Sequence, residues 1–346
     1  MKAVVYAGDG TVRLEEKPRP ELLEATDVIL RVTAAAICGT DLHLVEGKMP
    51  GFEEGVILGH EFVGVVDEVG AAVRSVEPGQ RCVASMQTAC GGCRACSRHD
   101  YRNCPSFALF GMGYAFGGLD GGQAEYVRVP LADMTLAEVP PELSEESAVL
   151  VSDILPTAYT AMIRAGVRPG DTVAVVGAGP VGQLAVMCAR LFGASQVFAI
   201  DMVAERLKEA EALGAVPVDA SRVDPSDFVA DHTGFLGADI VVEAVGTQSA
   251  VATAWSLGRT GAVIAMIGML VDEDWPTSCG DSWLKALDVR PILGDSITHR
   301  WDLLRLAQAA RLDPGRIISH VLPLDEAVDA YRMFAAREAT KVVVRP

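Results

Sequence analysis

Basic residues are scarce in this sequence. It contains 29 Lys and Arg against 46 Asp and Glu, which gives a formal net charge of −17 at pH 7. Nucleic acids and anionic membranes are bound through clustered Lys and Arg. The composition therefore excludes both as expected partners, and the surplus of acidic residues is interpreted as a charge that keeps the protein in solution.

Long apolar segments and repeats are also lacking. The opening residues, MKAVVYAGDG, predict a short strand and a glycine turn, without the apolar stretch of a secretory signal, so we expect a cytoplasmic protein. Residues 172–189 carry no charge and approach the roughly 18 residues of a membrane-spanning helix. Gly177, Gly179, Pro180 and Gly182 interrupt them, which favours a strand, a turn and a helix. No repeat of fixed period is present, which excludes a solenoid.

The length predicts two domains, because single cores stop growing near 250 to 300 residues and this chain has 346. Residues 1–154 contain short β-like runs broken by Gly and Pro, such as VILRVTAAAI, which predict a mainly β domain. Residues 155–294 alternate strands such as TVAVVGAG with helices such as VGQLAVMCARLFGA, which predicts an α/β fold with a doubly wound parallel sheet. Residues 295–346 have a mixed texture that fits either domain, and we assign them to the first.

A glycine motif predicts the nucleotide site. Gly177, Gly179 and Gly182 form G-x-G-x-x-G after an apolar strand and before a helix. The first glycine allows a tight turn, the second a close approach to the pyrophosphate, and the third close packing of helix on strand. The helix N-terminus then offers free N–H groups to the phosphates.

Asp201 predicts the cofactor. It ends the next strand, QVFAID, 19 residues beyond Gly182, where a carboxylate accepts hydrogen bonds from the adenosine ribose. The same charge repels a 2′-phosphate, so NAD is expected rather than NADP. The alternative is an ordinary Asp at the start of a helix.

Four cysteines predict a closed metal site. They form a C-x2-C-x2-C-x7-C run made of Cys90, Cys93, Cys96 and Cys104. In a cytosolic chain this spacing indicates a metal rather than disulfides, and four thiolates close a tetrahedron around zinc with no open position, which makes the site structural. An iron–sulfur cluster is the alternative, although nothing else suggests electron transfer. His99 lies in the same loop and is a possible substitute ligand.

A second cluster predicts an open metal site. Cys38 lies in ICGTDLH, and His60 and Glu61 follow in a Gly-His-Glu sequence. Cys, His and a carboxylate form a three-ligand zinc site whose fourth position stays open for water or substrate. The remaining cysteines are expected to be buried small hydrophobes, namely Cys82, Cys188 and Cys279.

At this point a family resemblance becomes clear. Residues 59–73, GHEFVGVVDEVGAAV, resemble the signature of the zinc alcohol dehydrogenases of the medium-chain dehydrogenase/reductase superfamily. With the two cysteine motifs and the glycine motif in that order, the resemblance covers essentially the whole chain. It implies a GroES-like catalytic domain and a Rossmann coenzyme domain.

The resemblance also implies the ligands of the catalytic zinc. They are Cys38, His60 and a residue at the start of the coenzyme domain, which in this chain is Asp153. The liver-type enzymes have cysteine there, whereas Asp resembles the branch that holds bacterial secondary-alcohol dehydrogenases and glutathione-independent formaldehyde dehydrogenases. Glu61 resembles a glutamate that can replace water as a ligand, and Asp41 resembles the carboxylate that orients the histidine ligand.

Further roles are implied by the same resemblance. Thr40 and His43 resemble the proton relay. Gly39 stands where the liver-type enzymes have an arginine that binds pyrophosphate. The expected coenzyme contacts beyond the glycines and Asp201 are Thr157, Val181, Arg206 and Lys341. Met86 and Met269 fall where substrate is contacted, and core packing is expected for Phe110, Met112 and Trp283.

The resulting hypothesis is an NAD-dependent zinc alcohol dehydrogenase with two zinc ions per chain. Its substrate would be a small primary or secondary alcohol, or the matching aldehyde or ketone, bound in an apolar pocket. The alternatives are a polyol or amino-alcohol dehydrogenase, a formaldehyde-dehydrogenase-like dismutase, and a nucleotide-binding relative without turnover, which the complete ligand set argues against. The resemblance also predicts a homotetramer or a homodimer.

Overall fold

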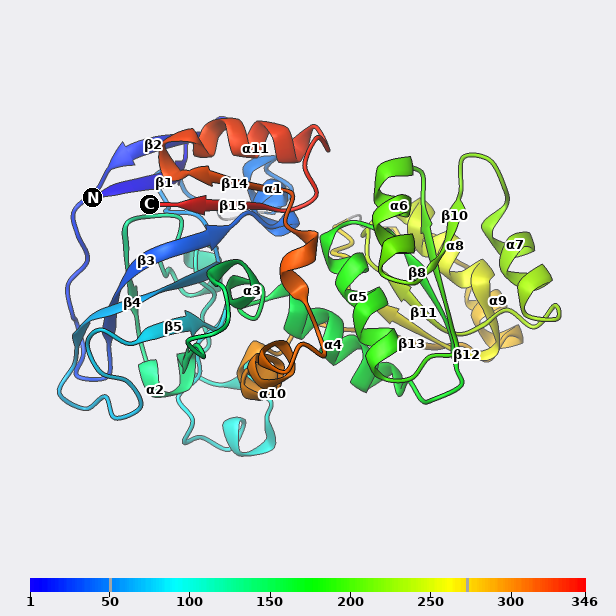
Figure 1. Cartoon of the computed structure of the whole chain (residues 1–346), viewed down its shortest axis with the longest axis horizontal. Coiled ribbons are helices and arrows are strands. Elements are labelled where there is room, and N and C mark those ends of the chain that lie inside the picture. The colour runs from blue at the N-terminus through cyan, green and yellow to red at the C-terminus, as the bar shows by residue number, and fades with distance from the viewer. Residues whose placement is uncertain (50–51, 272–273) are drawn as a thin grey trace. The chain divides into compact units, whose positions relative to one another are not determined.

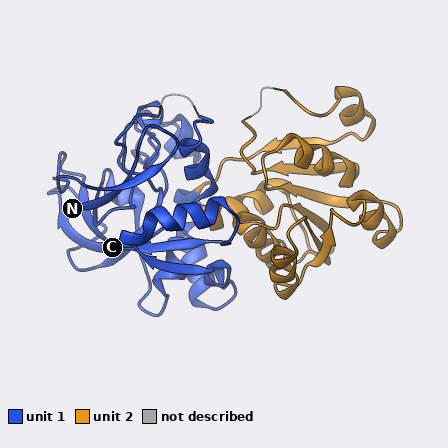
Figure 2. Cartoon of the chain, turned by 90° about the horizontal axis from the view of Figure 1, so that it is seen from above, with its two compact units in different colours: residues 1–153, 296–346 blue, residues 154–295 orange. Residues whose placement is uncertain are grey.

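The computed structural model describes residues 1–49, 52–271 and 274–346. It divides into two compact units (Figure 2). Unit 1 comprises Met1–Asp153 and Ser296–Pro346, and unit 2 comprises Ile154–Asp295. Within the described ranges, every helix is too short or too polar to cross a membrane.

Unit 1 is built on β-sheet (Figure 1). Its larger sheet has the order β14-β15-β3-β4-β5-β7, with β6 also paired to β3, and β1 and β2 form a separate hairpin. The strands are β1 (Lys2–Tyr6), β2 (Val12–Glu16), β3 (Val28–Ala36), β4 (Glu61–Val69), β5 (Arg81–Ala84), β6 (Tyr126–Val129), β7 (Leu136–Glu138), β14 (His320–Pro323) and β15 (Val342–Arg345). The central strand β3 is buried along most of its length because it lies between other strands and carries the apolar run VILRVTAAA.

Unit 1 has three short α-helices and two longer ones in its C-terminal segment. The short helices are α1 (Gly39–Val45), α2 (Ala132–Thr135) and α3 (Glu145–Val149), and the longer ones are α10 (Ser296–Gln308) and α11 (Ala327–Ala335). The buried positions of α11 are Ala327, Ala330, Tyr331 and Phe334, a spacing that gives one apolar face. This face packs into the same core cluster as β3 and β4, so the C-terminal segment completes unit 1.

Unit 2 is a six-stranded sheet in the order β10-β9-β8-β11-β12-β13, and all of its pairs are parallel. The strands are β8 (Thr172–Val176), β9 (Gln196–Asp201), β10 (Val216–Asp219), β11 (Ala238–Glu243), β12 (Gly258–Met266) and β13 (Asp288–Pro291), and the helices are α4 (Ile154–Ala165), α5 (Pro180–Leu191), α6 (Ala204–Ala212), α7 (Pro225–His232), α8 (Gln248–Leu257) and α9 (Cys279–Leu284). The strand order reverses between β8 and β11, and nucleotides bind at such a switch point. The doubly wound fold expected from the sequence is confirmed.

Candidate metal centres and coenzyme site

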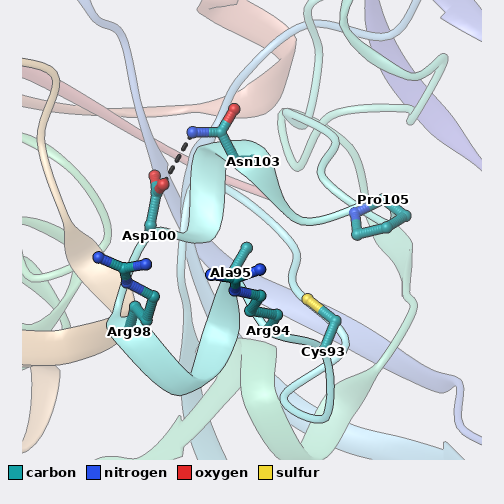
Figure 3. Close-up of a pocket in the computed structure, with 7 residues that line it drawn as sticks. All are labelled: Cys93, Arg94, Ala95, Arg98, Asp100, Asn103 and Pro105. Carbon is teal, nitrogen blue, oxygen red and sulfur yellow. Dashed lines mark hydrogen bonds between the residues drawn. The ribbon is translucent and has the colours of Figure 1, made fainter.

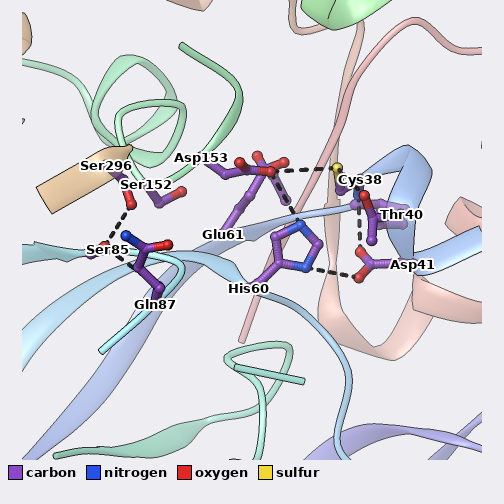
Figure 4. A network of polar contacts seen from close by, with 12 residues as sticks. Cys38, Thr40, Asp41, His60, Glu61, Ser85, Gln87, Ser152, Asp153 and Ser296 are labelled. Carbon is purple, nitrogen blue, oxygen red and sulfur yellow. Dashed lines mark hydrogen bonds and ion pairs between the residues drawn. The ribbon is translucent and has the colours of Figure 1, made fainter. Parts of the chain in front are cut away.

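The first candidate centre lies within unit 1 and joins three segments. Cys38 lies between β3 and α1, His60 and Glu61 lie at the start of β4, and Asp153 ends the first part of the unit. One ligand atom from each of these four buried residues lies within 4.8 Å of all the others. Oδ2 of Asp153 is 3.7 Å from Sγ of Cys38 and 3.2 Å from Nε2 of His60 (Figure 4).

This donor set fits zinc. Ligands placed tetrahedrally at about 2.0–2.3 Å from the metal are about 3–4 Å from one another, and the two distances above fall in that range. A thiolate, an imidazole and a carboxylate together balance the charge of Zn²⁺. In the protein alone, burial raises the pKa of the Cys38 thiol and the charge of Glu61 raises it further, so a cation is needed to hold the thiolate form.

Asp41 supports His60 from behind. The carboxylate is fully buried in the first turn of α1, and its Oδ1 lies 3.2 Å from Nδ1 of His60 (Figure 4). Its Oδ2 accepts a hydrogen bond of 2.9 Å from the backbone N–H of Cys38. Burial disfavours a charged His60, but the charges of Asp41 and Cys38 outweigh it and raise the His60 pKa well above its usual value. The distances orient the ring, since Nδ1 lies next to Asp41 and Nε2 lies next to Asp153 in the centre.

Glu61 is paired with Lys341 rather than with a ligand of the centre. Lys341 Nζ donates to Glu61 Oε1 at 2.7 Å and to the carbonyl of Ile37 at 2.9 Å. The Oε2 atom of Glu61 has no hydrogen-bond partner in the described part of the chain, and Glu61 belongs to the four-residue cluster. The Lys341 side chain is buried and engaged in this pair. Its contact with a pyrophosphate stays a prediction.

The two relay candidates lie on α1. Thr40 Oγ1 is 3.8 Å from Cys38 Sγ, which places its hydroxyl beside the centre. His43 follows one helical turn later, and its Nδ1 has no hydrogen-bond partner among the described residues. Burial lowers the pKa of His43, and the charge of Lys48 lowers it further. The imidazole is therefore neutral at pH 7 and has a free nitrogen.

The second candidate centre is the four-cysteine lobe. One Sγ atom from each of Cys90, Cys93, Cys96 and Cys104 lies within 4.8 Å of the other three, and the Cys90 and Cys96 sulfurs are 4.0 Å apart. In the protein alone, a backbone hydrogen bond from Gly92 lowers the pKa of Cys90 to about 7, whereas burial raises the pKa of Cys96 to about 12. Four sulfur donors leave no open coordination position, which fits a structural zinc.

His99 does not join these cysteines. Its Nδ1 lies 3.0 Å from the hydroxyl of Tyr101, and it is absent from the metal-binding cluster formed by described residues.

A surface pocket lies beside the four cysteines (Figure 3). It is lined by Cys93, Arg94, Ala95, Arg98, Asp100, Asn103 and Pro105.

The glycine motif in unit 2 has the geometry that a pyrophosphate requires. Gly177 has φ of +95°, so it makes the turn after β8 in the region that favours glycine. A Cβ on Gly182 would lie 1.8 Å from the carbonyl oxygen of Gly177, so helix α5 packs against the turn only with glycine there. A Cβ on Gly179 would meet nothing closer than Arg206 Nη1 at 3.9 Å, which leaves its backbone open to a ligand.

Asp201 is fixed at the end of β9 by backbone groups. Its Oδ2 accepts from the N–H of Ala178 at 2.8 Å, and its Oδ1 accepts from Met202 and Val203 at 2.7 and 2.9 Å. Arg206 Nη1 lies 4.0 Å from Asp201 Oδ2. The carboxylate is therefore held beside the glycine turn, as a ribose-binding residue would have to be.

The remaining predicted contacts are divided between the units. Val181 lies in the first turn of α5, and Thr157 lies in α4. Gly294 packs closely against Thr157, because a Cβ placed on Gly294 would lie 2.0 Å from the Thr157 hydroxyl. Met269 is partly buried in unit 2. Met86, in unit 1, is buried in an apolar cluster with Leu44, Leu109 and Met112.

The packing expectations for the aromatic and methionine residues are met only in part. Phe110 and Met112 are buried as expected. Trp283 is 80% exposed, so the expectation that it packs in the core is wrong. It lies on the short helix α9, whose residues are all at least partly exposed.

Three residues near these sites were not identified from the sequence. Gln123 and Tyr331 extend the hydrogen bonding behind Asp41, and no local pattern connects positions so far apart in the chain. Glu243 is buried, and it accepts hydrogen bonds from Val245 and Gly246. Its place at the carboxyl end of β11 was the signal that could have identified it.

Comparison with known proteins agrees with both halves of the structure. The family model "Alcohol dehydrogenase GroES-like domain" matches residues 24–141, and the model "Zinc-binding dehydrogenase" matches residues 180–309. A zinc-binding alcohol dehydrogenase of Mycobacterium tuberculosis is 36% identical over 349 residues, which cover 100% of this chain and 89% of the relative.

Two solved structures have the same fold. The alcohol dehydrogenase TADH from Thermus sp. ATN1 is 40% identical, with a TM-score of 0.95 and coverage of 100% of this chain and 99% of that one. A zinc-binding dehydrogenase from Sinorhizobium meliloti, bound to NADP, is 32% identical, with a TM-score of 0.87 and coverage of 100% and 99%.

The chain belongs to the zinc-dependent alcohol dehydrogenases of the medium-chain dehydrogenase/reductase superfamily. It is an oxidoreductase that uses zinc and a nicotinamide cofactor to transfer a hydride between a small-molecule alcohol and its carbonyl product.

Proposed function

We propose that this enzyme prefers NAD, holds two zinc ions per chain and oxidises small primary or secondary alcohols or reduces the matching aldehydes and ketones. The observation that carries the proposal is the buried cluster of Cys38, His60, Glu61 and Asp153 within unit 1. We assign residues 1–154 and 295–346 to a catalytic domain and residues 155–294 to a coenzyme domain.

Cys38, His60 and Asp153 would hold the catalytic zinc, with Glu61 as an alternate ligand. Bound there, zinc acts as a Lewis acid on the substrate oxygen. Asp41 orients His60 through their 3.2 Å contact. Burial raises the pKa of Glu61, the charge of Lys341 partly opposes this rise, and Lys341 Nζ holds Oε1 of Glu61 at 2.7 Å. Cys90, Cys93, Cys96 and Cys104 of the four-cysteine lobe would hold the second, structural zinc.

Proton transfer would use α1. The Thr40 hydroxyl lies beside Cys38, where it can take the proton of the alcohol as it gives up its own to His43, which can release a proton towards solvent. The lowered pKa of His43 supports this role, because it keeps the ring in its proton-accepting form at neutral pH.

The coenzyme would bind at the switch point of the parallel sheet. Gly177, Gly179 and Gly182 would receive the pyrophosphate, and Asp201 would accept hydrogen bonds from the ribose hydroxyls. A carboxylate there repels a 2′-phosphate, which supports NAD, whereas the NADP-bound relative from Sinorhizobium meliloti shows that the fold also accommodates NADP. The further contacts proposed for the coenzyme are Thr157, Val181, Arg206 and Lys341.

Substrate would contact Met86 and Met269. The apolar surroundings of Met86 support an aliphatic or aromatic alcohol over a sugar. Asp153 in place of cysteine supports the secondary-alcohol and formaldehyde-dehydrogenase-like branch. Polyol or amino-alcohol oxidation and aldehyde dismutation are the alternatives, and a panel of alcohols and aldehydes with NAD distinguishes them, since dismutation proceeds without net reduction of added NAD.

Two further proposals concern the setting of the enzyme. None of the eight cysteines, all of which lie in the described ranges, forms a disulfide bond, which supports a reducing compartment such as the cytoplasm. Association into a dimer or tetramer is supported in unit 2, where no described strand pairs with the outer edge of β13 and the preceding helix exposes Trp283 and Leu284. Light scattering tests the oligomeric state.

Elemental analysis of freshly purified protein tests the metal assignment. Wild type should contain two zincs per chain. Cys38→Ala should contain one and lose turnover while its melting temperature changes little, whereas Cys93→Ala should contain one and melt at a lower temperature. Cys82→Ala, which removes a buried thiol outside both clusters, is the control and should keep both zincs. One zinc or none in the wild type would overturn the proposal.

A further inference from the structure

We propose that Gln123 and Tyr331 are positioning residues for the catalytic metal, which connect the C-terminal helix α11 to His60 through Asp41. The inference rests on the proposed function, because it assumes that Cys38, His60 and Asp153 bind zinc. It assigns to residues of the loop before β6 and of α11 a role that no sequence motif indicates.

A continuous series of polar contacts carries the inference, with two hydrogen-bonded steps followed by one ion-pair contact. The Tyr331 hydroxyl donates to Gln123 Oε1 at 2.7 Å. The Gln123 Nε2 group donates to Asp41 Oδ2 at 3.2 Å and to the carbonyl of Ala36 at 3.3 Å. Asp41 Oδ1 in turn lies 3.2 Å from His60 Nδ1. Three side chains thus separate helix α11 from the metal centre.

The direction of each bond is fixed by chemistry. The Ala36 carbonyl and the Asp41 carboxylate only accept, so the Gln123 amide must turn its NH2 group towards them and its oxygen towards Tyr331. Burial raises the pKa of Tyr331 well above its usual value, and the nearby charge of Asp41 raises it further. The tyrosine therefore stays protonated, and its hydroxyl donates a hydrogen bond to the oxygen of the Gln123 amide.

Packing gives Gln123 a second hold on the same segment. Gly59, which precedes His60, has φ of +95°, and a Cβ placed on it would lie 2.5 Å from Gln123 Cγ. The glutamine side chain therefore occupies the space beside the backbone that carries His60. Gln123 and Asp41 are fully buried and Tyr331 is 5% exposed, so water is not available to replace a lost partner.

The effect should be specific to one of the two proposed zinc sites. Loss of Gln123 removes one of the two N–H donors that fix Asp41 Oδ2, leaving only the backbone N–H of Cys38. Asp41 can then rotate, and His60 is held less firmly for the metal. The four-cysteine lobe has no contact with this series in the bonds described, so its zinc is an internal control.

The test is the rate at which purified holoenzyme releases zinc to a chromogenic chelator. We expect Gln123→Met to release one zinc per chain about 10–100-fold faster than wild type. We expect Tyr331→Phe to release it about 3–10-fold faster, as for the loss of one buried hydrogen bond. Because Tyr331 acts through Gln123, the double variant should release zinc no faster than Gln123→Met alone. The second zinc should leave all variants at the wild-type rate.

Tyr6→Phe is the matched control. Tyr6 is a buried tyrosine of the same core cluster, and its hydroxyl has no hydrogen bond in the described part of the chain. If Tyr331→Phe released zinc at the rate of Tyr6→Phe, or if Tyr331→Phe added its full effect to Gln123→Met, the inference would be overturned. Tyr331→Phe alone decides the matter if Gln123→Met does not fold. A Cys38→Ala protein that still held two zincs would overturn the proposed function instead.

Discussion

Lys341 and Glu61 form an ion pair that water does not reach. Their Nζ and Oε1 atoms are 2.7 Å apart, and the side chains are 1% and 0% exposed. Burial disfavours the ammonium, but the charge of Glu61, its hydrogen bond to Lys341 and the charges of Cys38 and Asp153 together outweigh it, so the Lys341 pKa is raised rather than lowered. Lys2 and Asp325 are separated by the same 2.7 Å but are 42% and 59% exposed. The two pairs differ mainly in burial.

Replacing Lys341 with Met should destabilise the protein strongly, because Glu61 would be left as an uncompensated buried charge. Removal of one partner of such a pair costs about 3–5 kcal/mol. Urea unfolding measures the loss, and Lys2→Met is the control, for which little change is expected. Equal effects of the two variants would show that burial does not determine the strength of the Lys341–Glu61 pair.

Asp153→Asn should weaken the catalytic zinc site, because a neutral amide replaces the carboxylate that lies 3.7 Å from Cys38 Sγ and 3.2 Å from His60 Nε2. We expect turnover to fall by about 10–100-fold or more, together with a loss of zinc in elemental analysis. Asp120→Asn, at another carboxylate of unit 1 outside the metal clusters, should leave both unchanged. Full activity and two zincs in the Asp153→Asn protein would indicate that Glu61 is the carboxylate ligand.

Asp201→Gly should relax the preference for NAD, because it removes the charge that opposes a 2′-phosphate. The ratio of kcat/KM for NAD to that for NADP is the measurement. The variant also loses the acceptor for the N–H groups of Ala178, Met202 and Val203, so KM for NAD should rise as well. Asp219→Gly is the control, since Asp219 pairs with Asp201 in register on the adjacent strand β10. A wild type that prefers NADP would contradict the prediction.

His43→Gln should slow alcohol oxidation by at least about 10-fold. General acid–base groups typically contribute about 100-fold or more. Because the His43 pKa is lowered, the wild type should stay active below pH 6.5 until that pKa is reached, and the variant should lack this step. The unfolded chain binds the proton more tightly, so protonation of His43 also reduces stability as the pH falls. His320→Gln, in a partly exposed position, should keep the wild-type profile.

The sequence predicted the central strands of the fold more readily than its edges. β8 was predicted because TVAVV is an apolar run followed by a glycine turn, as expected for a strand buried on both faces. The edge strands β10 and β13 have the sequences VPVD and DVRP, which lack such a run. Pro217 and Pro291 are tolerated there because an edge strand leaves one side of its backbone unpaired.

The site was predictable to the extent that its residues lie close together in the sequence. The four cysteines of the lobe fall within 15 residues, so their spacing alone indicated a metal. Asp153 lies far from Cys38 in the sequence and was identified only through the family resemblance. Tyr331 is separated from Gln123 by 208 residues, and their contact depends on how the loop before β6 packs against helix α11 in three dimensions.

The division of unit 1 into two chain segments has a consequence for biosynthesis. The ribosome completes Cys90 to Cys104 early, so the four-cysteine lobe would be able to take up the proposed structural zinc while translation continues. Tyr331 and Lys341, which support the other centre, are made only after all of unit 2, which at about 5–20 residues per second takes on the order of ten seconds more. Until then, Glu61 has no cation beside it and Gln123 has no tyrosine donor, so the supports of the proposed catalytic site would be completed after the four-cysteine lobe.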